Sequence, residues 1–178
     1  MAPRLYHFSD DPNIERFVPR SLPGVQRSRG REWLNGPLVW AIDDWHQPMY
    51  LFPRNCPRIL LWRLPASTAE DIDAHFGRSQ ARMLAHIEAD RLDELKRATL
   101  YHYELPRDSF EDLDDAGMWV SSETVEPLDC STFDHLDERL READVELRTL
   151  PTLEPLKGIW DTTLHASGIR LRYAVGFD

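Results

Sequence analysis

The stretch RLYHFS, residues 4–9, opens the chain with a pattern of period two. The aromatic side chains of Tyr6 and Phe8 alternate there with the polar side chains of His7 and Ser9. Such alternation is typical of a β-strand, in which successive side chains point to opposite faces of the sheet. We expect Tyr6 and Phe8 to face a hydrophobic core, and His7 and Ser9 to face a cleft.

Strands and helices are interspersed along the rest of the chain. Further strands are predicted at residues 37–42, 58–65, 99–106, 117–130 with a break near 121–123, 145–151 and 168–175. Helices are predicted from a capping box at residues 67–70, over about 80–97 and over 131–143, where Ser131 would be the cap, with a short helix capped by Asp43 or Asp44. Residues 9–24 are expected to form a loop and residues 26–36 a polar, mobile segment.

The order of these elements predicts the fold class. They do not form regular βαβ units, which favours an α+β fold with mixed or antiparallel sheets and flanking helices. The chain has 178 residues and 42% hydrophobic content, which suits one globular domain spanning residues 1–178.

The net charge of −10 is unevenly distributed. Residues 1–63 hold 9 basic and 6 acidic residues, and residues 64–178 hold 12 and 25, so the two parts carry +3 and −13. The acidic majority argues against non-specific nucleic-acid binding but permits a small anionic ligand near the N-terminal arginines. No apolar run approaches the ~20 residues that span a membrane, and no apolar signal core is present. We therefore expect a cytoplasmic protein without a membrane partner.

Familiar catalytic and metal-binding motifs are missing from the sequence. It contains no Walker pattern, GxGxxG, GxSxG or HExxH. Cys56 and Cys130 lie far apart, so neither a disulfide framework nor a cysteine-rich zinc site is expected. The histidines show no i,i+4 spacing on a predicted helix, and no metal is expected, although folding could still bring three of them together.

Aromatic and basic residues gather in WAIDDWHQPMYLFPR, residues 40–54. Aromatic rings stack on nicotinamide, adenine or sugar rings, and an arginine fork binds phosphate. Trp45, His46, Tyr50 and Arg54 are therefore candidate ligand-binding residues. An aromatic core remains the alternative interpretation of this segment.

Polar candidates occur at three other points of the chain. His7 could bind a ligand hydroxyl, or could be fixed by a backbone carbonyl. In WVSSETVEP, residues 119–127, Glu123 lies where a carboxylate can stabilise a positive centre, or it is simply a solvated glutamate. In WDTTLHASGIRLR, residues 160–172, His165 and Arg170 indicate the edge of a site, unless the segment only shapes a turn.

Four long stretches together resemble a bacterial family of small proteins of unknown function. They are LYHFSDDPNIERFVPR, EWLNGPLVWAIDDWHQPMYLFPRNCPRILLW, YHYELPRDSFEDLDDAGMWVSSETV and WDTTLHASGIRLR. The resemblance covers nearly the whole chain, but it brings no established activity with it.

The order of elements is also similar to that of the ADP-ribosyltransferase fold. In that fold an opening strand carries Tyr-His, a second strand leads into a short helix with an aromatic residue, and a later strand presents a glutamate. The resemblance implies NAD as a substrate. It implies that His7 holds the ribose and adenosine side of NAD, that Tyr50 stacks on nicotinamide, and that the Glu123 carboxylate binds the ribose 2′-hydroxyl and is catalytic.

The sequence thus predicts an α+β protein with an ADP-ribosyltransferase-like core that binds NAD or a related nucleotide and transfers ADP-ribose to an unknown acceptor or releases nicotinamide. Its catalytic residues would be His7 and Glu123, and its binding residues Ser9, Arg20, Trp45, His46, Tyr50, Arg54, His165 and Arg170, with Arg20 or Arg54 on the pyrophosphate. The alternative is a non-enzymatic module that binds a small ligand or a protein through arginines and the aromatic side chains of Trp33, Trp40, Trp45 and Trp62. A metal-assisted hydrolase built on His7, His46 and His165 is a third interpretation.

Overall fold

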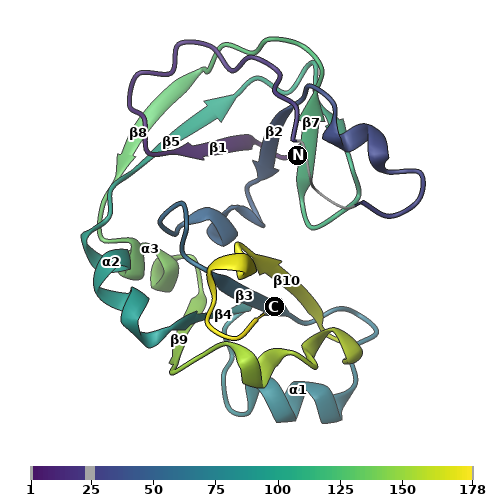
Figure 1. The fold of residues 1–178 in the computed structure, drawn as a ribbon, viewed down its shortest axis with the longest axis vertical. Coiled ribbons are helices and arrows are strands. Elements are labelled where there is room, and N and C mark those ends of the chain that lie inside the picture. The colour runs from purple at the N-terminus through teal and green to yellow at the C-terminus, as the bar shows by residue number, and fades with distance from the viewer. Residues whose placement is uncertain (1, 23–26, 178) are drawn as a thin grey trace. The chain divides into compact units, whose positions relative to one another are not determined.

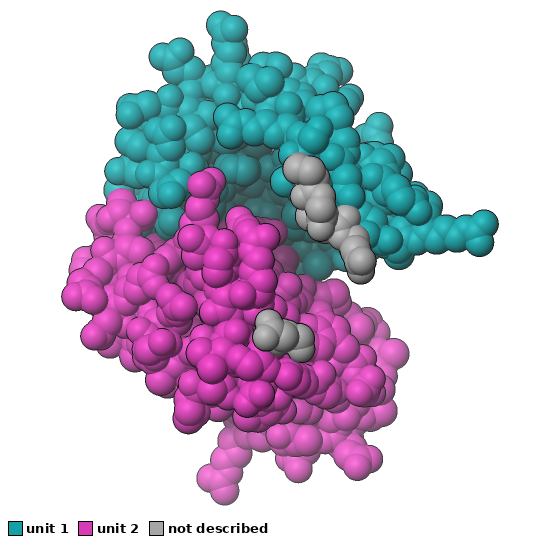
Figure 2. All heavy atoms as spheres, viewed as in Figure 1, with its two compact units in different colours: residues 1–47, 100–133 teal, residues 48–99, 134–178 magenta. Residues whose placement is uncertain are grey.

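The chain divides into two compact units. The computed structural model describes residues 2–22 and 27–177 (Figure 1), so residues 23–24 of the predicted loop and residue 26 of the predicted polar segment lie outside the described residues. The first unit comprises residues 1–47 and 100–133, and the second comprises residues 48–99 and 134–178 (Figure 2). Because the chain passes from one unit to the other three times, neither unit is a continuous piece of sequence.

The described part of the first unit holds a six-stranded sheet with the order β6-β7-β2-β1-β5-β8, in which every pairing is antiparallel. Its strands are β1 (Leu5–Ser9), β2 (Val39–Asp43), β5 (Leu100–Leu105), β6 (Glu111–Asp112), β7 (Met118–Ser121) and β8 (Asp129–Phe133). Two 3-10 helices flank β2, namely η1 (Glu32–Asn35) and η2 (Gln47–Tyr50), and η2 begins at the last residue of this unit's first stretch.

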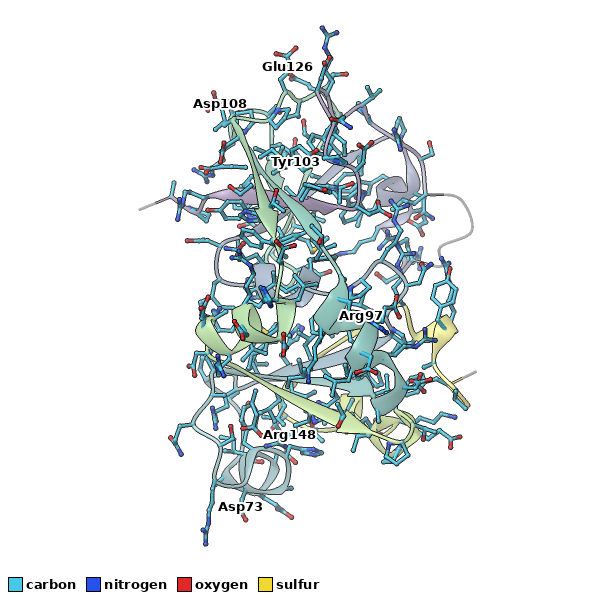
Figure 3. The ribbon with its side chains drawn as sticks, turned by 90° about the vertical axis from the view of Figure 1, so that its left-hand side faces the viewer. Asp73, Arg97, Tyr103, Asp108, Glu126 and Arg148 are labelled. Atoms are coloured by element: carbon cyan, nitrogen blue, oxygen red, sulfur yellow. The ribbon has the colours of Figure 1, made fainter. Side chains whose placement is uncertain are left out.

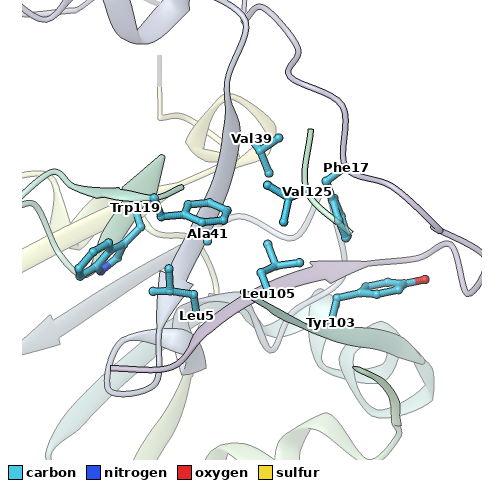
Figure 4. Close-up of a cluster of buried hydrophobic side chains, with 9 residues drawn as sticks. Leu5, Phe17, Val39, Ala41, Tyr103, Leu105, Trp119 and Val125 are labelled. Carbon is cyan, nitrogen blue, oxygen red and sulfur yellow. The ribbon is translucent and has the colours of Figure 1, made fainter. Parts of the chain in front are cut away.

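One face of this sheet forms a hydrophobic core (Figure 4). Its buried members are Leu5, Phe17, Val39, Ala41, Tyr103, Leu105, Phe110, Trp119 and Val125. Residues directly opposite each other in an antiparallel pair point to the same face, and the register pairs His7 with Tyr103. His7 therefore lies on the core face, and the expectation that His7 faces away from the core is wrong. Tyr6 is also buried, but on the other face, where its ring stacks on His102.

The described part of the second unit holds a four-stranded sheet with the order β10-β3-β4-β9. Its strands are β3 (Arg58–Trp62), β4 (Met83–Glu88), β9 (Val145–Leu150) and β10 (His165–Ile169). The helical elements of this unit are α1 (Ala69–Phe76), η3 (Ala89–Arg91), α2 (Leu92–Arg97), α3 (Leu136–Glu142), η4 (Glu154–Leu156), η5 (Ile159–Asp161) and η6 (Leu171–Tyr173). The pairing of β4 with β9 is parallel and the other two are antiparallel, so the prediction of an α+β fold with mixed sheets and flanking helices is confirmed.

The helix predicted over residues 80–97 is wrong in its first half. Residues 83–88 form β4, a central strand in which every residue is buried, and only 92–97 are α-helical. A strand buried on both faces loses its polar alternation, and a short apolar run of this kind cannot be distinguished from helix by periodicity alone. Pairing with two neighbouring strands decides the outcome here.

Three further boundaries differ from the predictions. The strand expected over 117–130 is two strands, β7 and β8, and Ser131 lies in β8 and caps no helix. α3 begins at Leu136, after His135 in the left-handed conformation, because Leu136 and Leu140 are the residues one turn apart that become buried. The last strand is β10, which begins earlier than predicted and is followed by η6.

Most of the other predicted elements are confirmed. β1, β2, β3, β5 and β9 lie within the ranges expected from sequence or extend at most one residue beyond them. The capping box shifts by one residue, because Thr68, whose side chain accepts a hydrogen bond from Asp71 N–H, is the cap of α1. At the other end of α1, the guanidinium of Arg148, a residue of β9 that is labelled in Figure 3, donates to the carbonyls of His75 and Phe76. In the described ranges, no helix has the length and apolar character needed to cross a bilayer.

Candidate functional site

On the core face of the first unit, the ring of His7 contacts Trp40 and Phe17. Its Nδ1 lies 2.9 Å from the carbonyl oxygen of Trp40, and its ring centroid lies 4.7 Å from that of Phe17. A carbonyl oxygen only accepts, so Nδ1 carries the hydrogen and the lone pair of the neutral ring resides on Nε2. The carbonyl contact that the sequence left as an alternative is therefore present, and it defines the tautomer of His7.

Glu123 lies on an exposed loop that begins where β7 ends. Its backbone N–H donates to Ser121 Oγ over 3.1 Å, and Ser121 Oγ in turn donates to Ser109 Oγ over 2.8 Å. The chain returns to the sheet at Val125, which exchanges two backbone hydrogen bonds of 2.8 and 2.9 Å with Phe17. The loop of Glu123 is thus anchored by hydrogen bonds on both sides.

Phe17 connects the segments of His7 and Glu123. Its ring packs against His7, and its backbone pairs with Val125, two residues after Glu123. Figure 4 shows Phe17 and Val125 next to each other in the core of the first unit. The two residues predicted to be catalytic therefore belong to segments that both contact Phe17, one through its ring and the other through its backbone.

Ser9 and Arg20 have local roles that the structure makes explicit. Ser9 Oγ accepts a hydrogen bond of 3.1 Å from Asp11 N–H and so shapes the turn after β1. The backbone of Arg20 pairs with that of Leu38, while the Arg20 side chain is exposed. Contacts within the protein therefore account for the positions of both residues.

Asp43 and His46 form a hydrogen-bonded pair at the end of β2. Asp43 Oδ1 accepts from the backbone N–H of His46 over 2.7 Å and lies 2.8 Å from its Nδ1. The exposed ring of Trp45 packs edge-on against His46 at 4.5 Å between centroids. Gly117, at φ +71°, allows this pair, because a Cβ there would overlap the His46 ring and lie 2.6 Å from Asp43 Oδ2.

The four remaining predicted residues belong to the second unit, where Tyr50 and His165 pack against neighbours. The guanidinium carbon of Arg58 lies 5.6 Å from the Tyr50 ring centroid, and burial raises the Tyr50 pKa. The His165 ring stacks on Trp62 with centroids 3.8 Å apart, and its Nε2 lies 3.1 Å from Ser167 Oγ.

Arg54 and Arg170 are exposed. Arg54 lies on a turn, and Arg170 has a left-handed φ of +58°. The first unit thus contains His7, Ser9, Arg20, Trp45, His46 and Glu123, and the second contains Tyr50, Arg54, His165 and Arg170.

Arg58 is a notable polar residue that the sequence reasoning missed. It is only 3% exposed, at the start of β3, and both Nε and Nη1 donate to backbone carbonyls, those of Met49 and Cys56. The available signal was a charged residue at the head of the otherwise apolar run RILLW, residues 58–62. Buried charges of this kind are uncommon and call for a specific explanation.

The metal-assisted hydrolase interpretation requires a cluster of metal ligands, and the described ranges contain none. Among these residues, no three His, Cys, Asp or Glu side chains lie close enough together to hold a metal ion. His7 and His46 belong to the first unit and His165 to the second, each with the contacts given above.

Comparison with known proteins places the chain in a family. The model of a family described as "Family of unknown function (DUF6886)" matches residues 6–174. Searches for similar proteins of curated function and for similar solved structures found no match. Because the match extends over nearly all of its residues, the chain belongs to this family of unknown function, DUF6886.

Proposed function

We propose that the first unit binds NAD or a related nucleotide and has an ADP-ribosyltransferase-like site formed around His7 and Glu123. The observation that carries this proposal is the link through Phe17, whose ring packs on His7 and whose backbone pairs with Val125, close after Glu123. Two extended residues span at most about 7 Å, so the backbone of Glu123 lies within about that distance of Val125.

The order of strands supports the same grouping. The strand of His7, β1, is separated from the strand that leads to Glu123, β7, by the single strand β2. With neighbouring strands ~4.8 Å apart, the backbones of β1 and β7 run about 10 Å from each other. A ribose ring with its hydroxyl groups is of a size to bridge side chains that extend from such strands.

The chemistry of the two side chains suits the reaction. With the hydrogen of Nδ1 directed at the Trp40 carbonyl, Nε2 is the ring nitrogen of His7 that would accept a hydrogen bond from a ribose hydroxyl. The carboxylate of Glu123 stabilises the positive charge that develops on the ribose as its bond to nicotinamide breaks. The bonding electron pair leaves with nicotinamide, and a water or another acceptor forms the new bond to the ribose and gives up its proton.

NAD binding and nicotinamide release test the proposal. We expect NAD to raise the melting temperature of the wild-type protein and to be cleaved slowly to free nicotinamide. His7→Ala should abolish the NAD-dependent rise, while Glu123→Gln should keep binding and reduce nicotinamide release by at least about 100-fold, a typical loss for a group that stabilises transition-state charge.

Glu126→Gln is a matched control for Glu123→Gln. Glu126 is exposed, lies three residues further on and pairs with Arg16 at 3.2 Å. This control should leave both binding and release unchanged. The proposal is abandoned if NAD neither stabilises the wild-type protein nor yields nicotinamide, or if the control loses as much activity as Glu123→Gln.

A second candidate function is non-enzymatic binding through aromatic side chains. It is favoured by the exposure of Trp33 and Trp45, which are 51% and 39% exposed, although Trp62 is buried in the second unit and does not belong to such a surface. Such a module would lose ligand-dependent stabilisation on Trp45→Ala and keep it on Glu123→Gln.

A further inference from the structure

The second unit contains a buried cation for which the described residues provide no acidic partner. Arg58 lies beside the rings of Tyr50 and Phe52, at 5.6 and 5.0 Å from its guanidinium carbon. Its Nε and Nη1 donate to the carbonyls of Met49 and Cys56 over 2.8 and 3.0 Å. In the part of the chain that the structure describes, Nη2 has no hydrogen bond and no carboxylate forms an ion pair with Arg58.

A second arginine adjoins this cation. Ile169 is the residue of β10 directly opposite Arg58, and Arg170 follows it in the left-handed conformation. Arg170 is exposed, and no ion pair or side-chain hydrogen bond of Arg170 occurs among the described residues. The charges of both arginines also act on the hydroxyl of Tyr50, where each lowers the pKa against the larger effect of burial.

The two positive charges oppose each other. Burial lowers the pKa of Arg58 to about 10, and among the smaller effects the charge of Arg170 lowers it as well. Arg58 still carries its proton at neutral pH, so the fold holds two adjacent cations, one of them removed from water. Such an arrangement costs free energy unless an anion compensates it.

Two less buried arginines of the same unit have carboxylate partners. Arg148 pairs with Glu146 at 2.7 Å, and Arg91 lies 3.5 Å from Glu94. Both of these arginines are more exposed than Arg58 and therefore need compensation less. Among the described residues, Arg58 is the arginine that is buried, and no carboxylate pairs with it there.

Polar groups continue along the same face of the sheet. Ser167 and His165 lie on β10 at positions that alternate with Ile169, so they share the face of Arg58. Ser167 is opposite Leu60 and is therefore a diagonal neighbour of Arg58, with Cβ atoms about 7 Å apart. Its hydroxyl, which lies 3.1 Å from His165 Nε2, provides a further hydrogen-bonding group.

We propose that Arg58 and Arg170, with Ser167 beside them, form a binding site for a phosphoryl group in the second unit. Donors on three separate residues suit a tetrahedral oxyanion with several oxygens better than a planar carboxylate with two. The site would take inorganic phosphate, pyrophosphate or the phosphate of a larger molecule. It does not rest on the function proposed for the first unit, since neither nicotinamide nor ribose takes part.

Calorimetric titration of the full-length protein with pyrophosphate, phosphate and acetate at constant ionic strength tests this site. We expect pyrophosphate to bind and to raise the melting temperature, and acetate to bind at least about tenfold more weakly. Arg170→Ala should weaken pyrophosphate binding by about tenfold or more, as expected for the loss of a charge-assisted contact. Without ligand, the same variant should melt no lower than the wild type, because a repulsion is removed.

Arg172→Ala is the matched control, since Arg172 is exposed, lies in η6 two residues after Arg170 and donates a hydrogen bond to the Tyr173 hydroxyl. It should bind pyrophosphate like the wild type, and Arg58→Lys, which keeps the charge and loses the fork, should bind more weakly. The site is refuted if pyrophosphate does not bind, if acetate binds equally well, or if Arg170→Ala and Arg172→Ala have equal effects. Pyrophosphate binding without NAD binding would leave this site standing and remove the function proposed for the first unit.

Discussion

The two sheets differ in where they hold their polar residues. In the second unit the central strands β3 and β4 are buried at every position, yet they include Arg58, His86 and Glu88. In the first unit the interior strands β1 and β5 are only partly buried, and their histidines His7 and His102 are half-buried. Charged and histidine side chains are thus buried in the sheet of the second unit, whereas the histidines of β1 and β5 are only partly buried.

This difference separates two kinds of candidate site. A half-exposed histidine with a defined tautomer can bind a ligand without any change in the fold. A buried arginine or histidine instead affects the stability of the fold, because its charge must be compensated or its proton released. The comparison therefore predicts that pH and ligands act on the stability of the second unit more strongly than on that of the first.

The largest expected effect concerns His86 in the second unit. His86 is 5% exposed, and burial, followed by the charge of Arg148, lowers its pKa to about 4. The pKa of His86 in the folded protein lies below the ordinary value of 6.5, so on acidification the unfolded chain takes up this proton first. The free energy of unfolding is therefore at its full value above pH 6.5, decreases as the pH falls toward 4 and loses nothing more from His86 below that. The loss amounts to roughly 3 kcal/mol, measured by urea unfolding across this range.

His86→Gln should remove most of that pH dependence. His135→Asn is the control, because His135 is exposed and its left-handed conformation tolerates asparagine. Equal pH slopes for the wild type and His86→Gln would show that the buried histidine does not set the acid sensitivity, and the contrast between the two units would lose its main support.

A smaller effect is expected at Gly117 in the first unit. Gly117→Ala combines strain at φ +71° with an overlap of the new Cβ and the Asp43–His46 pair. Gly30→Ala provides the control, since Gly30 has φ +86° and a Cβ added there would meet nothing within 4 Å. We expect Gly117→Ala to lose about 1–3 kcal/mol more unfolding free energy than Gly30→Ala. If urea titrations show that both variants lose the same unfolding free energy, the Asp43–His46 pair moves aside at no cost.

The smallest effect, with no loss of stability, concerns the two free thiols. Cys130 in the first unit is exposed, whereas Cys56 in the second is buried and its pKa is raised to about 11 by that burial. Only the thiolate reacts with the aryl disulfide DTNB. The native protein should therefore release one equivalent of the coloured thiolate quickly and a second only in urea. Rapid release of two equivalents would contradict the burial of the second unit's interior.

Sequence patterns predicted those parts of the fold that depend on local alternation. The strands at β1, β2, β5 and β9 follow from alternating or apolar runs bounded by turn residues. β4 could not be recognised, because a strand buried on both faces has no polar alternation, and its neighbour β9 lies more than fifty residues away in sequence. The start of α3 was misplaced because β8 pairs with β5, a contact that no local pattern encodes.

The candidate site was predictable in residue type but not in arrangement. The sequence singled out His7 and Glu123, and their functional roles stay predictions. The contact that links their segments involves Phe17, in a region expected only to form a loop. Asp43 was considered only as a helix cap, although it also holds the His46 ring. Arg58 was overlooked because a sequence does not reveal whether a charged residue at a strand end is buried and unpaired.

The interleaving of the two units has a consequence for how the protein is made. As the chain leaves the ribosome, β1 can pair with β2 early, but its other neighbour, β5, is synthesised only after the whole of the second unit's first stretch, residues 48–99. Until then one edge of β1 stays unpaired, and such edges associate readily with other chains. Closing contacts of such sequence separation is also slow. The nascent protein is therefore prone to aggregate until β5 has been made. A protein with two domains that follow one another in sequence would avoid this delay.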